Sequence, residues 1–294
     1  MSVQRTVWVC VGLLACSCKR GPDMAVADEA AAAATRHVDR GRESVSTVST
    51  GLLATLGRCA VPVGATLTTP VDPARVRNTL RDLHEERSPL GRELAFYPTR
   101  FLTLLGADGK AIASDRPPAE DVLPGRDLAG AFPCAAAALQ GRAGTCVAEF
   151  SHREAEPPRV FFAAAQPARV AEGAPVTGAL VGVISLASLA RSIRTDLDVR
   201  TVSERVQLRV GFLVGDRVVP SGSDNTVPEA YLVPDTLVPR VPRDAWSKLQ
   251  SLHGRFTFTF TENDGRFQWG AAIGTVPALG ERVALVVFRS PLRQ

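Results

Sequence analysis

Arg126 and Asp127 stand side by side just before a short alanine-rich segment at residues 131–140, which we predict to be a helix. The guanidinium of arginine presents a planar fork of N–H donors that matches a carboxylate, so Arg126 could pair with a carboxylate-bearing ligand. Aspartate is also one of the preferred residues at the start of a helix. The alternative interpretation is therefore that Asp127 caps the helix and that Arg126 is solvated.

Three further residues are candidates for the same binding site. Ser114 and Asp115 end a short apolar segment and could line the site beside Arg126, or form a turn. Phe161 and Phe162 are adjacent in a segment with strand character, so their side chains must point to opposite faces of a sheet. Phe162 is a candidate ligand contact, and packing in the core is its alternative role.

Three aromatic residues late in the chain could form a second ligand wall: Tyr231, Trp246 and Trp269. Packing of a helix on a sheet explains the same residues, and it is the interpretation that we prefer for them.

Cys134 and Cys146 lie twelve residues apart, at the start of a predicted helix and inside the strand that follows it. A helix that folds back on its neighbouring strand brings such positions together, so we expect a Cys134–Cys146 disulfide. A loop of this length would contribute about 3 kcal/mol to stability. Cys18 and Cys59 could also pair, and the sequence leaves that pairing open.

The sequence lacks the short motifs that are typical of enzymes and of metal-binding sites. The sequence has no Cys-x-x-Cys and no Gly-x-Ser-x-Gly, His-Glu-x-x-His, Walker or Gly-x-Gly-x-x-Gly motif. The histidines are isolated from one another, at His37, His84, His152 and His253. We therefore predict no catalytic residues, no metal site and no cofactor.

The N-terminus carries a targeting signal. Arg5 precedes an apolar stretch at residues 6–15, which has the length of a secretory signal rather than of a membrane span. The stretch ends in Leu-Leu-Ala-Cys at residues 13–16, which resembles a bacterial lipobox and makes Cys16 the predicted lipidation site. We predict a signal peptide at 1–15 and a tether at 16–28. The alternatives are a plain secretory signal and a short membrane anchor.

Composition places the rest of the chain among ordinary globular proteins. Of 294 residues, 45% are apolar and 22% are charged, and the net charge is only +4. Positive charge comes almost entirely from arginines spread along the chain, and aromatic residues make up 6%. A nucleic-acid-binding protein would show a basic face interleaved with aromatic residues, so we expect no nucleic-acid partner.

The residues that could do chemistry must be positioned by two kinds of element. Helical spacing of apolar residues predicts one long helix over 25–57 and a second over 72–95, with a kink at Pro89, inside a helical region at 29–98. After residue 98 the apolar period becomes two, and the order strand-strand-helix-strand-strand-strand occurs twice, at 100–186 and 206–289. We place two modules at 99–200 and 201–294.

This order predicts an α+β fold, in which a long N-terminal helix precedes two modules. Each module would be a five-stranded antiparallel sheet with a flanking helix. The arrangement resembles the extracytoplasmic double Cache sensor domains, which are relatives of the PAS fold. The segments that carry the resemblance are 101–115 (FLTLLGADGKAIASD), 125–128 (GRDL), 138–141 (ALQG), 178–186 (GALVGVISL), 267–273 (FQWGAAI) and 283–288.

The resemblance implies a small-molecule sensor in the bacterial cell envelope, with Arg126 and Asp127 in the loop that lids the pocket of such domains. The ligand would be organic and possibly anionic. Only six residues follow Phe288, so we expect a sensor without its own output domain, which signals through an envelope protein partner. The tryptophan and tyrosine cluster of the amino-acid-binding subgroup is missing from the first module.

The alternative is a structural or protein-interaction lipoprotein that binds no ligand and has pockets filled by side chains. In either case the lipid on Cys16 would hold the protein on a membrane, with Ser17 favouring the outer membrane or periplasmic face. The long helix could also serve as a homodimer interface.

Overall fold

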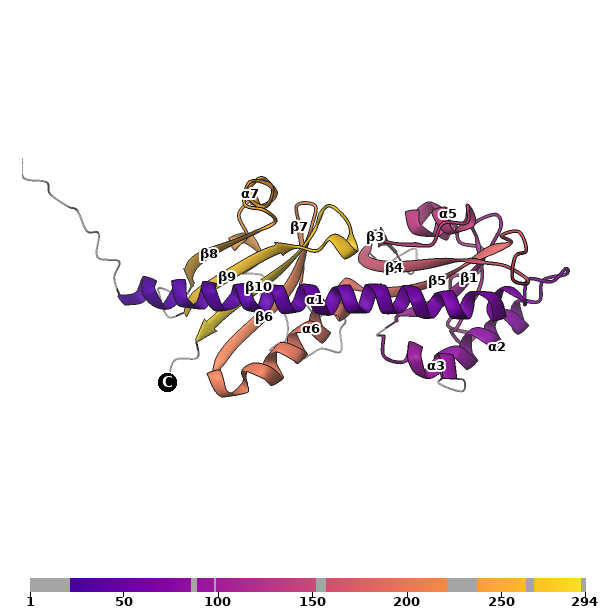
Figure 1. Ribbon diagram of the computed structural model, residues 1–294, viewed down its shortest axis with the longest axis horizontal. Helices are drawn as coiled ribbons and strands as arrows, with labels where there is room; N and C mark the ends of the chain where they lie inside the picture. The colour runs from indigo at the N-terminus through magenta and orange to yellow at the C-terminus, as the bar shows by residue number, and fades with distance from the viewer. Residues whose placement is uncertain are drawn as a thin grey trace, which may run out of the picture.

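The computed structural model describes residues 22–85, 89–97, 99–151, 157–220, 237–262 and 267–291. The predicted signal peptide and Cys16 lie outside these residues. Helix α1 (Pro22–Gly64) runs along the whole length of the described molecule and contacts both sheets (Figure 1). No helix among the described residues combines the length and the apolar character that a bilayer span requires.

Helix α1 is longer than the helix predicted over 25–57. Its buried positions continue the seven-residue spacing of Val38, Val45 and Leu52. The same buried stripe extends through Cys59 and Val63, so packing against the sheets carries the helix beyond the predicted end. Cys59 is buried as a free thiol, and Cys18, with which the sequence left a pairing open, lies outside the described residues.

The first module contains an antiparallel sheet in the order β2-β1-β5-β4-β3. Its strands are β1 (Phe101–Gly106), β2 (Ala111–Ser114), β3 (Gly144–Phe150), β4 (Arg159–Ala168) and β5 (Gly178–Ser185). Its helices are α2 (Pro73–His84), α3 (Pro89–Leu94), α4 (Leu128–Ala131) and α5 (Pro133–Leu139). Helix α5 contacts β3, β4 and β5, whereas α2 contacts β1 and β2.

The second module repeats this topology, with strand order β7-β6-β10-β9-β8. Its strands are β6 (Val206–Val214), β7 (Arg217–Pro220), β8 (Arg255–Glu262), β9 (Phe267–Thr275) and β10 (Val283–Pro291). Its helical elements are α6 (Leu186–Thr201), which joins the modules, η1 (Val202–Glu204), η3 (Val238–Arg240), α7 (Ala245–Ser251) and η4 (Pro277–Leu279). The predicted fold class, a long helix followed by two five-stranded antiparallel sheets with flanking helices, is confirmed.

Local chemistry sets several element boundaries. Asp72 caps α2, because its carboxylate accepts a hydrogen bond from the backbone N–H of Ala74 at 2.9 Å. Gly109 adopts a positive φ of 79° in the turn between β1 and β2, as the Asp-Gly pair predicts. The single helix predicted over 131–140 is wrong in one respect: Pro133 lacks a backbone N–H and starts a separate helix, α5.

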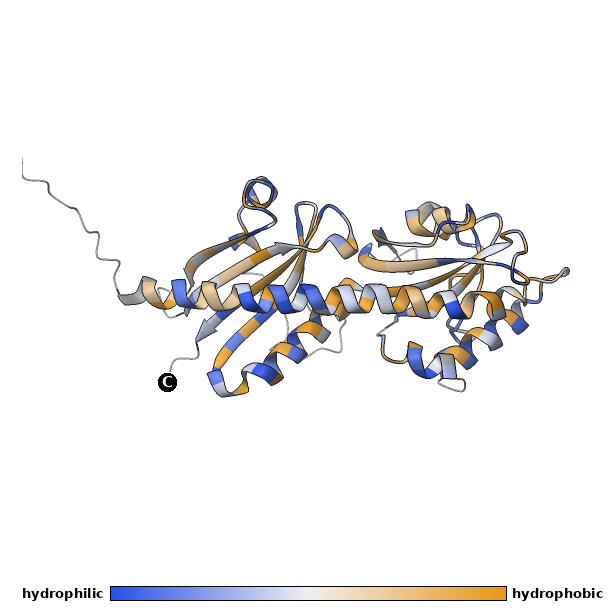
Figure 2. Cartoon of the chain, viewed as in Figure 1, coloured by the Kyte–Doolittle hydropathy of each residue, from blue (hydrophilic) through white to orange (hydrophobic). Residues whose placement is uncertain are grey.

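The core has three parts. One part is continuous along α1 and includes residues of both sheets, from Leu104 and Phe162 in the first to Phe212 and Leu285 in the second. The second part lies between the first sheet and α4 and α5, and the third lies between the second sheet and α7. The strands are mainly hydrophobic, while α1 and α6 mix both characters (Figure 2).

The disulfide between Cys134 and Cys146 is present, with the two Cα atoms 5.4 Å apart. It joins α5 to β3, which is the helix-to-strand contact that the sequence predicts.

Candidate functional site

Asp127 acts as a helix cap. Its carboxylate accepts a hydrogen bond from the backbone N–H of Gly130 at 2.7 Å, at the start of α4. This is the structural role that the sequence offered as the alternative to ligand binding. Asp127 also forms an isolated backbone bridge with Lys110, so it ties α4 to the turn between β1 and β2.

Arg126 is held by groups of the protein. Its Nη1 donates a hydrogen bond to the backbone oxygen of Ser151 at 2.7 Å. The guanidinium carbon lies 4.6 Å from the centre of the Phe150 ring, which places the cation over the ring face. These contacts fix Arg126 at the end of β3.

Ser114 and Asp115 each take part in a buried polar contact. The hydroxyl of Ser114 donates to Asp121 Oδ1 at 2.8 Å, and its backbone N–H donates to Asp121 Oδ2 at 3.0 Å. Asp115 accepts a hydrogen bond from the backbone N–H of Leu102 at 3.1 Å and also pairs with His84 Nδ1. The sequence analysis missed Asp121 and His84, because no regular spacing connects them with residues 114–115.

The contact with Asp115 changes the acidity of His84. The hydrogen bond to the carboxylate raises the pKa of His84 above its ordinary value of 6.5, and burial opposes this rise. His84 stands in the last turn of α2, so the pair fastens the end of that helix to the segment after β2.

Phe162 lies on the opposite face of the sheet from Phe150 and Phe161. It is fully buried in the core that contains α1, whereas Phe150 and Phe161 belong to the core beneath α5. The structure therefore does not bring Phe162 together with Arg126 and Asp127, and its placement matches the core-packing alternative.

Apolar side chains fill the space between the first sheet and α4 and α5. The buried residues of this layer are Phe101, Leu105, Ala111, Leu123, Leu128, Phe132, Cys134, Ala135, Ala138, Phe150, Phe161, Ala163, Ala165, Ala179, Val181 and Val183. Because Phe162 lies in the core along α1 and Arg126 packs on Phe150 of the other core, the described structure does not bring all five residues predicted as a first-module binding site together.

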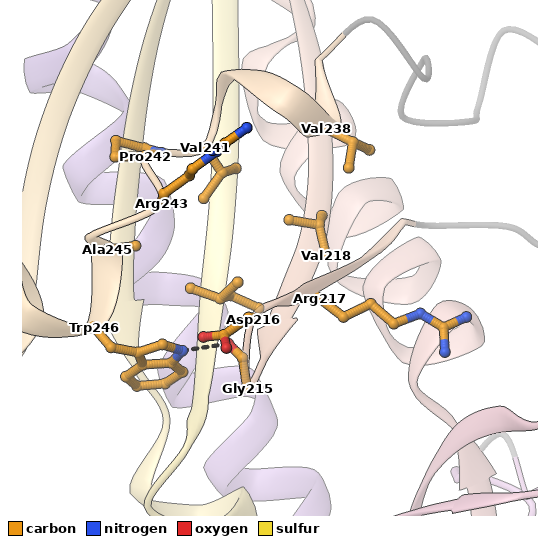
Figure 3. Close-up of a pocket in the computed structure, with 11 residues that line it drawn as sticks. Gly215, Asp216, Arg217, Val218, Val238, Val241, Pro242, Arg243, Ala245 and Trp246 are labelled. Atoms are coloured by element: carbon orange, nitrogen blue, oxygen red, sulfur yellow. Dashed lines mark hydrogen bonds between the residues drawn. The ribbon is translucent and has the colours of Figure 1, made fainter.

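A cavity of about 750 Å³ opens in the second module, between the β6–β7 turn and the segment that leads into α7 (Figure 3). We call it the Trp246 hollow. It is lined by Leu213, Gly215, Asp216, Arg217, Val218, Val238, Val241, Pro242, Arg243, Ala245 and Trp246. It is larger than the polar groove between α1 and α6, which has a volume of about 520 Å³.

The walls of the Trp246 hollow are mainly apolar. Figure 3 shows the side chains of Val218, Val238 and Val241 among the residues that line the hollow. The indole N–H of Trp246 donates a hydrogen bond to the backbone oxygen of Gly215, so it fixes the ring against the β6–β7 turn. An apolar space with a few polar groups at its edge is typical of small-molecule sites.

Charged side chains stand at the rim of the hollow. Asp216 pairs with Arg282 at 3.4 Å, and Arg217 pairs with Glu149 of the first module at 3.3 Å. Arg217 points away from Trp246 in Figure 3. Arg243 lies at the end of the hollow away from Trp246, where its side chain passes Val241.

The structure separates Trp246 from Trp269, two of the three aromatic residues that the sequence offered as a second ligand wall. Trp246 lines the hollow, whereas Trp269 is buried and stacks on Phe260 with 6.3 Å between ring centres. Tyr231 lies outside the described residues. Val238, Val241 and Arg243 were missed, because they belong to an irregular proline-containing segment without a periodic pattern.

No group of three or more histidine, cysteine, aspartate or glutamate side chains within the described ranges could hold a metal ion. The candidate functional site is the Trp246 hollow itself.

Comparison with known proteins gives a fold and no close relative. No protein-family model and no curated protein sequence matches the chain. Among solved structures, the sensory domain of the Campylobacter jejuni chemoreceptor Tlp3 (CcmL), with isoleucine bound, has a TM-score of 0.54 and 10% identity. The alignment covers 91% of this chain and 95% of that domain.

Two further structures have the same architecture. The ligand-binding domain of the Pseudomonas aeruginosa PAO1 amino acid chemoreceptor PctB, in complex with L-Gln, has a TM-score of 0.50 and 16% identity, with 88% and 89% of the chains covered. The sensor domain of the Vibrio cholerae histidine kinase DctB has a TM-score of 0.50 and 14% identity, with 90% and 98% covered. The chain therefore has the double Cache fold of such sensor domains.

Proposed function

We propose that this protein is an envelope sensory module that binds a small organic molecule in the Trp246 hollow. The observation that carries the proposal is the contrast between the two modules. Helices α5 and α7 follow the second strand of their module and lie on the corresponding face of its sheet. Buried apolar side chains pack between the first sheet and α5, whereas the segment before α7 borders a cavity of about 750 Å³.

The similarity of fold supports a sensory role for the molecule as a whole. The named structures are sensory or ligand-binding domains of chemoreceptors and a histidine kinase, and two of them hold an amino acid. A shared fold does not determine the ligand, which depends on the residues of the site. The chemistry of the ligand therefore depends on the residues that line the Trp246 hollow.

The membrane attachment is part of the proposal. The Leu-Leu-Ala-Cys sequence at residues 13–16 supports a lipid on Cys16, which would hold the sensor at the surface of a bacterial membrane. The envelope protein partner and the homodimer through α1 stay predictions of the sequence.

Filling the hollow tests the ligand site. Val218 is half-buried and faces the cavity, so Val218→Trp should occupy the space that a ligand needs. A thermal-shift screen of carboxylates, amino acids, amines and purines should give hits on the wild-type protein. At about 100 times its dissociation constant, a ligand stabilises a protein by roughly 2.7 kcal/mol, which is several degrees of Tm. The Val218→Trp variant should lose these shifts.

Val199→Trp is the matched control, because Val199 is 72% exposed on α6 and does not line the hollow. It should retain every hit. Shifts that persist in Val218→Trp would move the binding site elsewhere. A screen without hits on a well-folded wild-type protein would contradict ligand sensing and favour the structural or interaction role.

A further inference from the structure

We propose that the ligand of the Trp246 hollow is an organic carboxylate with an apolar body and without an ammonium group, and that Arg243 binds its carboxylate. This inference rests on the proposed function, because it specifies the chemistry of the ligand at the same site. In this proposal the carboxylate is bound by Arg243 of the second module and not by Arg126 of the first.

The apolar walls select the body of the ligand. Valine side chains from two segments line the cavity together with Trp246: Val218 comes from β7, and Val238 and Val241 come from the segment before α7. A volume of about 750 Å³ is within the usual range for small-molecule sites, which is roughly 300–1,000 Å³. A hydrocarbon or aromatic body would remove these surfaces from water, whereas a fully polar ligand would leave them without partners.

The charges at the rim select the head group. Asp216 is satisfied by Arg282, and Arg217 is satisfied by Glu149. Arg243 has no carboxylate of the described residues within ion-pair distance, although it lines the hollow. Among the described residues, Arg243 is therefore the cation of the hollow without a carboxylate partner, and the fork of donors of an arginine fits a carboxylate.

The same contacts disfavour an ammonium group. An ammonium needs acceptors, and the backbone oxygen of Gly215 already accepts the indole N–H of Trp246. The carboxylate of Asp216 is 88% exposed at the rim and pairs with Arg282. An amino acid or an amine would thus bring a positive charge close to Arg243 without a prepared partner.

Four compounds with the same phenyl-substituted four-carbon chain test the head group: 4-phenylbutanoate, 4-phenylbutanamide, 4-phenylbutylamine and the amino acid 2-amino-4-phenylbutanoate. Their affinities for the full chain would be measured by isothermal titration calorimetry at low salt. We expect the affinity of the acid to exceed that of the amide by a factor of at least about ten, and to exceed the affinities of the amine and of the amino acid by a larger factor. The Arg243→Gln variant should reduce the affinity for the acid to that for the amide, while the amide is unaffected.

Arg200→Gln is the matched control, because Arg200 is an exposed arginine on α6 that does not line the hollow. Its affinities should equal those of the wild-type protein. Equal binding of acid, amide and amine, or an unchanged affinity of Arg243→Gln for the acid, would overturn the inference and leave the proposed function standing.

The two proposals also fail separately when none of the four compounds binds. If another compound from the thermal-shift screen binds in a way that Val218→Trp abolishes, the inference is overturned alone. If no compound binds at all, both are overturned.

Discussion

At the scale of single residues, the two carboxylates near the end of β2, Asp115 and Asp121, find their hydrogen-bond partners within the protein. The side chains of Asp115 and Asp121 are buried and accept hydrogen bonds from backbone N–H groups and from a serine hydroxyl. Asp121 also pairs with Arg77 of α2 at 3.4 Å. Unpaired buried carboxylates are costly, so these contacts explain why polar residues stand at the end of β2 without a ligand.

The His84–Asp115 pair predicts a pH dependence of stability. Because the pKa of His84 is raised in the folded protein, the folded state binds a proton more tightly than the unfolded state. The resulting stabilisation is fully present below pH about 6.5 and is lost as the pH rises through the raised pKa. Glu85, Arg116 and Asp115 are the charged groups near this imidazole, and they oppose or support its charge.

Urea unfolding of wild type and His84→Gln would measure this effect. The midpoint difference between the two proteins should be larger at pH 5.5 than at pH 8.5. His253→Gln is the control, because His253 is exposed in the second module, away from Asp115. An equal loss of stability for His84→Gln at both pH values would refute the charge-dependent contact.

At the scale of elements, close packing of α1 on β9 decides how the second sheet is covered. Gly270 in β9 meets the backbone of α1, and a Cβ at this position would overlap the backbone nitrogen of Ala31 and lie 2.6 Å from the oxygen of Ala27. The buried alanines of α1, such as Ala30 and Ala34, permit the same close approach. Small residues on both elements therefore set the distance between helix and sheet.

Gly270→Ala should destabilise the protein, because the added methyl group must displace helix backbone rather than a flexible side chain. Overpacking of this kind costs typically about 1–3 kcal/mol and occasionally more. Gly144→Ala is the control, since nothing lies within 4 Å of a Cβ there. Chemical denaturation should show a clear loss for the first variant and none for the second; equal midpoints would mean that α1 does not lie so close to β9.

At the scale of the whole molecule, α1 joins the modules through a shared core. One continuous set of buried residues runs along this helix from the first sheet to the second. The turn at η4 adds a direct link, because the backbone oxygen of Ala278 accepts hydrogen bonds from Ser49 in α1 and Thr145 in β3. Strand β10 runs toward the end of the molecule where α1 begins (Figure 1).

Attachment of the whole molecule to a membrane depends on residues before α1. Cys16→Ser should remove the predicted acyl anchor and release the protein from the membrane fraction of a bacterial host, whereas the wild-type protein should need detergent for release. Cys18→Ser is the matched control, two residues away, and should remain bound. Release by Cys18→Ser instead would move the lipid to that cysteine, and release by neither would contradict a lipid anchor.

Short-range signals in the sequence were enough to predict the elements and their order. The Asp-Gly pair before β2, the alternation of β8 and the prolines at the helix starts act over a few residues, so they can be read without knowledge of the fold. The Cys134–Cys146 bond was predictable for the same reason, because helix and strand are neighbours in the chain.

The functional site depended on contacts that only the tertiary structure decides. The sequence left Arg126 and Phe162 with two roles each, and their partners, Ser151 for Arg126 and the core along α1 for Phe162, lie far away in the chain. The cavity is less predictable still, because its volume is what remains after side chains from separate segments have packed. By itself the sequence determined the double-module fold, and the tertiary structure decided where side chains from separate segments leave the Trp246 hollow open, because that packing depends on contacts between distant parts of the chain.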